Sequence, residues 1–360
     1  MKKILSIALA LVLVLSLGTV AFADGEEPAA DGTTDNGATI DPATYTEPEK
    51  VTITKVFKLT NADLGGVSPE ETFSFTTLTC ESVTDAAASV TKDTAPKPTV
   101  GDVSFAEGAA TADGTGTGTA TATITLPEYT SVGVYTYKFK EAVPETKTAG
   151  ITYNTADLYL VVTVIQGTNG KLRVAAVHCE GSHDKNTYGT SPKTDSFTNT
   201  YENGKLTVTK TVTGNLGDKT KYFKVTVTFA AASGEVNKST ISYSGGSGDY
   251  TVTNGTVPSS GVVELYLKDT DTFTFTNVPE GVTYTVDEDD YTTDGYTTTG
   301  EITTATAMTA GGEVTAAIVN DKTTTVDTGI SLDSLPYILI VAVVLSAAVV
   351  MFVNKRRSEV

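Results

Sequence analysis

The sequence predicts an all-β fold arranged as two tandem domains of sandwich or barrel type. Strand-forming residues dominate, because the 360-residue chain contains 16 Tyr and 12 Phe, and Thr and Val occur throughout. Glycine turns recur about every ten residues, a spacing typical of sandwiches and barrels. Outside the two termini, no apolar stripe follows the helical period.

The N-terminus has the three parts of a secretory signal peptide. A basic start at Met1-Lys2-Lys3 precedes an apolar run from Ile4 to Leu17, and Ala21-Phe22-Ala23 fits a cleavage site. We therefore expect residues 1–23 to be removed and the protein to be exported. Residues 24–44 are acidic and lack an apolar pattern, which predicts a disordered linker.

The C-terminal segment, residues 323–360, combines a short peptide, an apolar span and a basic end. The peptide contains Thr328 and Gly329, and the apolar stretch at 335–353 is long enough to cross a bilayer as a helix. The cations of Lys355-Arg356-Arg357 would hold the far end in the cytoplasm. In this order, the three parts resemble the sorting signal of Gram-positive surface proteins.

In proteins with that signal, a sortase cuts between the Thr and the Gly, here Thr328 and Gly329, and joins the Thr carbonyl to an amine. The resemblance implies an extracellular protein that is covalently attached to the cell wall, with a precursor that is transiently anchored in the membrane. The alternative, ordinary membrane helices at both ends, is weakened by the short N-terminal run and its cleavage site.

The charge of the chain argues against one class of partner. Lys and Arg number 25 against 43 Asp and Glu, which gives a formal net charge of -18. An acidic chain repels nucleic acid, so we expect no nucleic-acid partner, whereas high negative charge suits a soluble exported protein.

Between the termini, residues 45–203 and 204–322 are predicted to form two domains built on one plan, separated by a turn signal at Glu202-Asn203-Gly204. Each region opens with a similar strand containing a Lys, has a later strand ending in Glu, and closes on a short strand ending in Asn. These three pairs of strands are Val51–Lys55 and Leu206–Lys210, Tyr135–Glu141 and Val282–Glu288, and Phe197–Asn199 and Ile318–Asn320.

Strand alternation predicts that the Lys, Glu and Asn of each region point into its core. Lys55, for example, shares a strand face with Ile53 and Phe57, whereas Lys58 points outward and is a weaker candidate. The same count places the remaining residues inward: Glu141 and Asn199 in the first region, and Lys210, Glu288 and Asn320 in the second.

Burying an unpaired charge costs several kcal/mol, so a repeated Lys/Glu/Asn trio has two explanations. One is a buried salt bridge with an Asn hydrogen bond. The other is chemistry: a desolvated Lys amine attacks the Asn side-chain carbon, assisted by the Glu, expels ammonia and leaves an isopeptide crosslink.

Several segments resemble Gram-positive backbone pilins of the streptococcal type, and the resemblance covers about Val51 to Val353. The matching segments are 133–141, 150–154, 197–199, 278–284 and 288–291. The resemblance implies immunoglobulin-like (CnaB-type) β-sandwich domains with self-formed isopeptide bonds. By that match, Glu141 catalyses a Lys55–Asn199 bond and Glu288 a Lys210–Asn320 bond, with no cofactor. Because each bond forms once within its own chain, we do not expect an enzyme.

The resemblance also implies a covalent homopolymer, in which sortase joins Thr328 of one subunit to a lysine of the next. The expected acceptor is Lys193, with Lys185 as the second choice. Sortase, other pilin subunits and the peptidoglycan wall are then the partners, and a host ligand stays open.

The main alternative is a monomeric wall-anchored adhesin that binds host matrix or glycans. An aspartic protease is disfavoured because the triplet at 327–329 has no partner triplet.

The two cysteines, Cys80 and Cys179, lie in the first domain on segments predicted to be strands. A disulfide is permitted outside the cell, so a bridge and two isolated small hydrophobic residues are both open at this point. His178 and His183 flank Cys179 but have no second cluster at ligand spacing, so no metal site is predicted.

Overall fold

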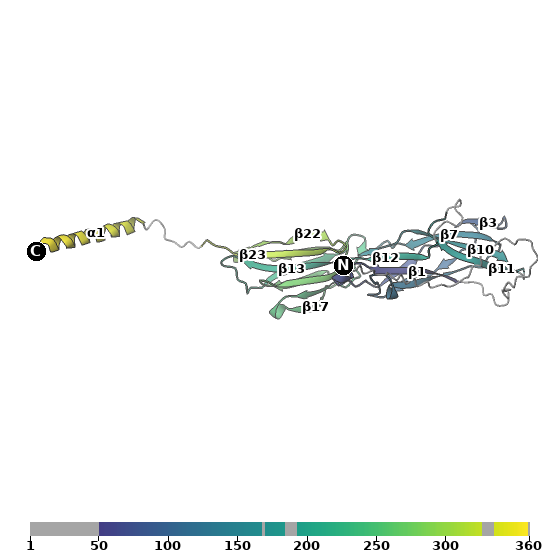
Figure 1. Ribbon diagram of the computed structural model, residues 1–360, viewed down its shortest axis with the longest axis horizontal. Coiled ribbons are helices and arrows are strands. Elements are labelled where there is room, and N and C mark those ends of the chain that lie inside the picture. Colours follow the sequence, from purple (N-terminus) through teal and green to yellow (C-terminus); the bar gives the residue numbers. More distant parts are fainter. Residues whose placement is uncertain (1–49, 168–169, 184–192, 326–334, 359–360) are drawn as a thin grey trace, which may run out of the picture. The chain divides into compact units, whose positions relative to one another are not determined.

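The computed structural model describes residues 50–167, 170–183, 193–325 and 335–358. Strands dominate the described residues and form two β-sandwiches, followed by one α-helix (Figure 1). The predicted all-β, two-sandwich fold is therefore confirmed. The predicted signal peptide and acidic linker lie outside the described residues.

The first sandwich contains two sheets. The strands of its first sheet are β1 (Lys50–Leu59), β4 (Thr99–Val100), β6 (Thr119–Thr125), β9 (Ile151–Thr152) and β12 (Ser196–Tyr201). The strands of its second sheet are β2 (Glu71–Phe75), β3 (Thr79–Thr84), β5 (Val103–Phe105), β7 (Gly133–Ala142), β10 (Asp157–Gln166) and β11 (Leu172–Glu180). The strand orders are β4-β6-β1-β12-β9 and β11-β10-β7-β2-β5, with β3 also paired to β7. Two 3-10 turns, η1 (Ala62–Leu64) and η2 (Gly116–Gly118), lie in its loops.

The second sandwich repeats this two-sheet plan. One sheet contains β13 (Asn203–Thr213), β16 (Ser242–Gly245), β17 (Val252–Thr256), β19 (Thr272–Pro279), β21 (Thr297–Thr299) and β23 (Glu313–Asp321). The other contains β14 (Phe223–Ala230), β18 (Val262–Leu267), β20 (Thr283–Glu288) and β22 (Ile302–Ala307). The strand orders are β17-β16-β19-β13-β23-β21 and β18-β14-β20-β22. Two further 3-10 turns are η3 (Gly248–Tyr250) and η4 (Thr292–Asp294). The short strands β8 (Lys147–Thr148) and β15 (Glu235–Val236) pair with each other.

Each sandwich has its own apolar core, because alternate residues of the facing strands point between the sheets. In the first core, the rings of Phe57, Phe73 and Phe105 pack edge to face, with centroids 5.2, 5.6 and 5.8 Å apart. In the second core, Phe229 and Phe275 pack with centroids 5.2 Å apart. Aromatic residues on the inward faces thus pack against one another in both cores.

The first and last strands of each sandwich lie side by side and run parallel. β1 pairs with β12, and β13 pairs with β23, as can be followed in Figure 1. Parallel neighbours cannot be joined by a short turn, so the rest of each sandwich lies between them in sequence. The strands by which the chain enters and leaves each sandwich are therefore hydrogen-bonded neighbours.

The predicted turn at Glu202-Asn203-Gly204 is wrong. Only Glu202 separates β12 from β13, and Asn203 and Gly204 pair with β19 in the sheet. Gly204 is glycine for packing, since a Cβ there would overlap the sulfur of Met308. The chain therefore passes almost directly from the last strand of one sandwich into the first strand of the next.

Hydrogen bonds join the two sandwiches where the chain passes between them. The Asn277 side-chain amide donates to the Val67 carbonyl at 2.9 Å, and the Tyr201 hydroxyl donates to Asn277 Oδ1 at 3.0 Å. Lys238 pairs with the buried carboxylate of Glu71 at 3.0 Å. These contacts pair polar groups of the two sandwiches across the boundary.

The C-terminal helix α1 (Leu335–Ser358) includes the predicted span at 335–353. Its segment Tyr337–Lys355 is long and apolar enough to cross a membrane, judged by length and composition. Thr328 and Gly329 lie outside the described residues.

Candidate functional site

The first candidate site is built across the first sandwich. Lys55 on β1 lies opposite Phe197 of β12, and Asn199 follows two residues later, on the same face of the sheet. Glu141 reaches the pair from β7 in the facing sheet. Lys55, Glu141 and Asn199 are all fully buried, as strand alternation predicts.

Glu141 bridges the other two side chains of this site. Lys55 Nζ lies 2.7 Å from Glu141 Oε2, and Asn199 Nδ2 donates to Glu141 Oε1 at 2.5 Å. The Asn199 carbonyl oxygen accepts a hydrogen bond from the backbone N–H of Asn154 at 2.9 Å. The ring of Phe73 covers the amine, with Nζ 4.3 Å from the ring centroid.

Burial changes the protonation of the first site. Desolvation lowers the pKa of Lys55 to about 8, against the opposing effect of Glu141, whose charge and hydrogen bond raise it. Below that pH the Lys55 amine carries a proton that lies in its hydrogen bond to Glu141 Oε2. Moving it from Nζ to Oε2 leaves an uncharged amine beside an uncharged acid, a form that a dry core favours.

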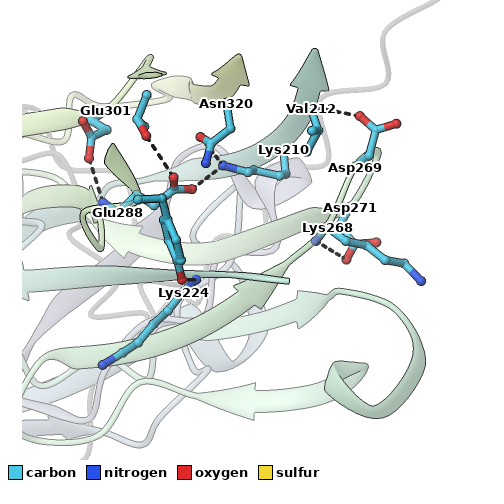
Figure 2. A network of polar contacts seen from close by, with 11 residues as sticks. Lys210, Val212, Lys224, Lys268, Asp269, Asp271, Glu288, Glu301 and Asn320 are labelled. Atoms are coloured by element: carbon cyan, nitrogen blue, oxygen red, sulfur yellow. Dashed lines mark hydrogen bonds and ion pairs between the residues drawn. The ribbon is translucent and has the colours of Figure 1, made fainter. Parts of the chain in front are cut away.

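The second site repeats the register of the first. Lys210 on β13 lies opposite Ile318 of β23, and Asn320 follows two residues later. Glu288, the last residue of β20, comes from the facing sheet. Figure 2 shows Lys210 and Asn320 projecting from adjacent strands toward the Glu288 carboxylate. All three side chains are buried.

The contacts within the second site differ from those within the first. Lys210 Nζ pairs with Glu288 and also donates to the Asn320 carbonyl oxygen at 2.6 Å. Thr298 Oγ1 donates to Glu288 Oε1 at 3.1 Å. Asn320 Nδ2 is buried and has no hydrogen-bond partner among the described residues.

The second lysine has the same apolar cover and the same direction of pKa shift. Its Nζ lies 4.3 Å from the centroid of the Phe223 ring, the same distance as at the first site. Desolvation lowers the pKa of Lys210 below its usual value, although Glu288 opposes the shift. Both sites therefore hold a lysine whose charged form is less favoured than in water, next to a carboxyl group and a carboxamide.

Chemically, each arrangement supplies the three parts that amide exchange needs. A neutral amine is a nucleophile, a carboxamide carbon is an electrophile, and a carboxyl group can move the proton that lets ammonia leave. A buried salt bridge alone would use the same residues, but it would not require an Asn at the same register in both sandwiches.

The other predicted residues are placed less completely. Lys193 is exposed and forms an isolated antiparallel β-bridge, a backbone pairing, with Glu180 shortly before β12. Lys185 lies outside the described residues. Lys58 is half-buried and faces away from the core, as predicted. His178 and His183 both contact Glu180, at 2.6 and 3.4 Å.

The disulfide alternative for Cys80 and Cys179 is corrected by the strand order, and both thiols are free. Cys80 on β3 lies opposite Tyr137 of β7, Tyr137 opposite Leu160 of β10, and Leu160 opposite Cys179 of β11. Three strand spacings of about 4.8 Å separate the cysteines, whereas bridged Cα atoms lie within about 7 Å. The isolated, buried alternative holds.

Four residues that contact the sites were not anticipated from the sequence. Phe73 and Phe223 could have been found by the strand alternation that revealed the lysines. Thr298 has no distinguishing signal among many threonines. Asn154 acts through its backbone N–H, which any residue except proline carries.

Comparisons with known proteins agree with this architecture. A family model described as a Spy0128-like isopeptide containing domain matches residues 51–202. A second model, a domain of unknown function (DUF7601), matches residues 204–322. A search of curated proteins found no match.

Among solved structures, the major pilin from Streptococcus pyogenes matches with a TM-score of 0.51 at 23% identity, covering 77% of this chain and 99% of that chain. A further Streptococcus pyogenes major pilin matches with a TM-score of 0.50 at 20% identity over the same shares. At this identity the likeness concerns the fold. Residues 51–202 thus match the model of the Spy0128-like isopeptide containing domain, in a chain that has the fold of the Streptococcus pyogenes major pilins.

Proposed function

We propose that this protein is a shaft subunit of a covalently polymerised cell-surface pilus, stabilised by Lys55–Asn199 and Lys210–Asn320 isopeptide bonds. The observation that carries the proposal is the repeated site. The same three residue types, at the same strand register, connect the first and last strands of both sandwiches.

The position of these bonds suits a protein that bears tension. Force applied at the chain ends would act on β1 and β12 in one sandwich and on β13 and β23 in the other. Without a crosslink, those strands are held by backbone hydrogen bonds that contribute about 1 kcal/mol each. A covalent bond between neighbouring entry and exit strands carries the load past the rest of each sandwich.

The proposed chemistry is self-limiting. Each lysine attacks one asparagine, each glutamate transfers one proton, and one ammonia leaves per site. Afterwards no nucleophile or leaving group remains, so each site acts once. The protein is accordingly a structural component, with Glu141 and Glu288 as single-use catalysts of its own maturation.

For polymerisation, sortase would join Thr328 of one subunit to Lys193 of the next. Lys193 is exposed and lies three residues before the first residue of β12, the last strand of the first sandwich. The helix α1 would hold the precursor in the membrane until sortase cuts, and the terminal subunit would then be attached to peptidoglycan. Lys185 is the alternative acceptor.

The test is the size distribution of this protein in cell-wall extracts of the producing bacterium. We expect a ladder of covalent multimers that disappears in a Thr328→Ala variant and in a Lys193→Ala variant. Lys92→Ala is the matched control, because Lys92 is an exposed lysine of the same sandwich. Loss of the ladder in a Lys185→Ala variant, with the ladder kept in Lys193→Ala, would identify Lys185 as the acceptor lysine. A single wall-attached species in the unmodified strain would contradict the shaft role and favour a monomeric adhesin.

A further inference from the structure

The orientation of the Asn199 carboxamide is fixed by a neighbour that can only donate. The backbone N–H of Asn154 points at one terminal atom of this side chain at 2.9 Å, so that atom must be the oxygen. The amide nitrogen then faces Glu141, to which it donates at 2.5 Å. The carbonyl oxygen and the leaving nitrogen are therefore held by two different groups.

The loop that carries this N–H is itself held in place. It follows β9, which pairs with β12 through Thr152 and Thr200. Asn154 Oδ1 accepts the backbone N–H of Ala156 at 2.8 Å, an Asx-type turn, and Asn154 Nδ2 donates to the Thr198 carbonyl at 3.4 Å. The side chain of Asn154 thus ties its own backbone to the strand that carries Asn199.

We propose that the backbone N–H of Asn154 is an oxyanion donor for closure of the first isopeptide bond, and that the Asn154 side chain positions it. This rests on the proposed function, because it concerns the same Lys55–Asn199 reaction. A donor held in place before reaction stabilises charge where it develops, and removing one such donor typically costs about 100- to 1000-fold in rate.

The reaction balances with the groups present. The neutral Lys55 amine attacks Asn199 Cγ, forming the new C–N bond and moving the carbonyl π electrons onto Oδ1, where the Asn154 N–H stabilises the negative charge by donating a hydrogen bond. Glu141 gives its proton to Nδ2 and takes one from Nζ. The carbonyl then re-forms, the Cγ–Nδ2 bond breaks, and neutral ammonia leaves without any change of oxidation state.

At the second site, the described residues place no backbone N–H on the corresponding oxygen. Asn320 Oδ1 accepts its hydrogen bond from the Lys210 amine, and Nδ2 has no partner in the part of the chain that the structure describes. The second bond therefore serves as an internal control within the same molecule: it should not depend on Asn154.

The experiment compares Asn154→Pro, Asn154→Gly and Asn154→Ala in the mature chain, residues 24–328. Unfolded chain is diluted into folding buffer, and each crosslink is timed by mass spectrometry with peptide mapping. Proline removes the N–H and should slow the first bond by roughly 100-fold or more. Glycine and alanine keep the N–H but lose the Asx turn, so we expect smaller, several-fold slowing. The second bond should close at the parent rate in all three.

Two further measurements separate this role from a structural one. In a Lys55→Ala background, where no first bond forms, the Asn154→Gly and Asn154→Ala changes should leave the melting temperature nearly unchanged. The pH at which the first-bond rate falls should also stay where it is in the parent chain, because Lys55 and Glu141 are untouched. Parent-like rates in the glycine, alanine and proline variants would overturn the proposal. Absence of the first bond in the parent chain would instead refute the proposed function.

Discussion

The two Lys/Glu/Asn sites share their framework and differ in how the asparagine is held. In both, the asparagine lies two residues beyond the partner of the lysine on a parallel strand, and a phenyl ring covers the amine at 4.3 Å. At the first site, Asn199 is held at both ends, by Asn154 and Glu141. At the second, the described residues hold Asn320 through its oxygen alone, by Lys210.

This difference shows that strand topology brings the reacting side chains together, whereas local structure around each site positions them. Parallel pairing of the first and last strands brings lysine and asparagine together, and the facing sheet supplies the carboxyl group. The fine positioning comes from local structure: the loop after β9 at the first site, and the Thr298 hydroxyl on β21 at the second. We therefore expect both bonds to form, with different sensitivity to substitutions around them.

The largest expected effect is loss of the second crosslink. Asn320→Ala removes the electrophile but keeps the Lys210–Glu288 ion pair, so it isolates the covalent bond. The proposed crosslink would join residues 110 positions apart, and by analogy with disulfides such a loop would contribute about 4.7 kcal/mol. The melting temperature measured by calorimetry should fall by roughly 10–20 °C.

Lys224→Ala is the matched control for that measurement. Lys224 forms a partly exposed pair with Glu264 at 2.7 Å on the same sandwich, and such pairs contribute less than about 1 kcal/mol. If Asn320→Ala melted no lower than Lys224→Ala, the second bond would have no part in stability.

A second effect is the pH dependence of first-bond closure. The reactive form, neutral amine with neutral acid, carries the same single proton as the ion pair. The pKa of Lys55 is lowered to about 8, so that proton is present below pH 8 and is lost above it. The closure rate of refolding chain should be level from neutral pH to about 8 and then fall roughly tenfold per unit. A rate that rises through pH 8 would mean that Glu141 does not deliver a proton.

The smallest predicted effect concerns Thr298, whose hydroxyl has no counterpart at the first site among the described residues. Thr298→Val keeps the shape of the side chain but removes the hydrogen bond to Glu288, which is worth about 1 kcal/mol. The second bond should close several-fold more slowly, while the first keeps its rate in the same sample. Equal slowing of both bonds would point to general misfolding rather than to positioning of Glu288.

Much of this arrangement could be predicted from strand alternation alone. Because side chains alternate between the two faces of a strand, Lys55, Glu141 and Asn199 can be placed on inward faces without knowing which strands are neighbours. The same Lys/Glu/Asn trio in the second half of the chain supports the prediction that these residues form a site. Alternation also explains why Lys58 lies outside the core. The turn predicted at Asn203-Gly204 was wrong because glycine there serves a close approach to Met308 rather than a turn.

Features that depend on strand order or on backbone groups could not be predicted. The separation of Cys80 from Cys179 follows from the order β3-β7-β10-β11, which the sequence does not specify. The backbone donor of Asn154 is present in almost every residue, so only the path of the loop reveals it. The sorting peptide around Thr328, outside the described residues, remains a prediction.

The most direct test of the central claim is the intact mass of the mature chain, residues 24–328, under reducing conditions. Each isopeptide bond releases one ammonia, about 17 Da, so two bonds predict a deficit of about 34 Da. Glu141→Ala and Glu288→Ala should each restore about half of it, with peptide mapping showing one bond lost in each. A parent chain at its full calculated mass would contradict the account, because the two buried trios would then be salt bridges only.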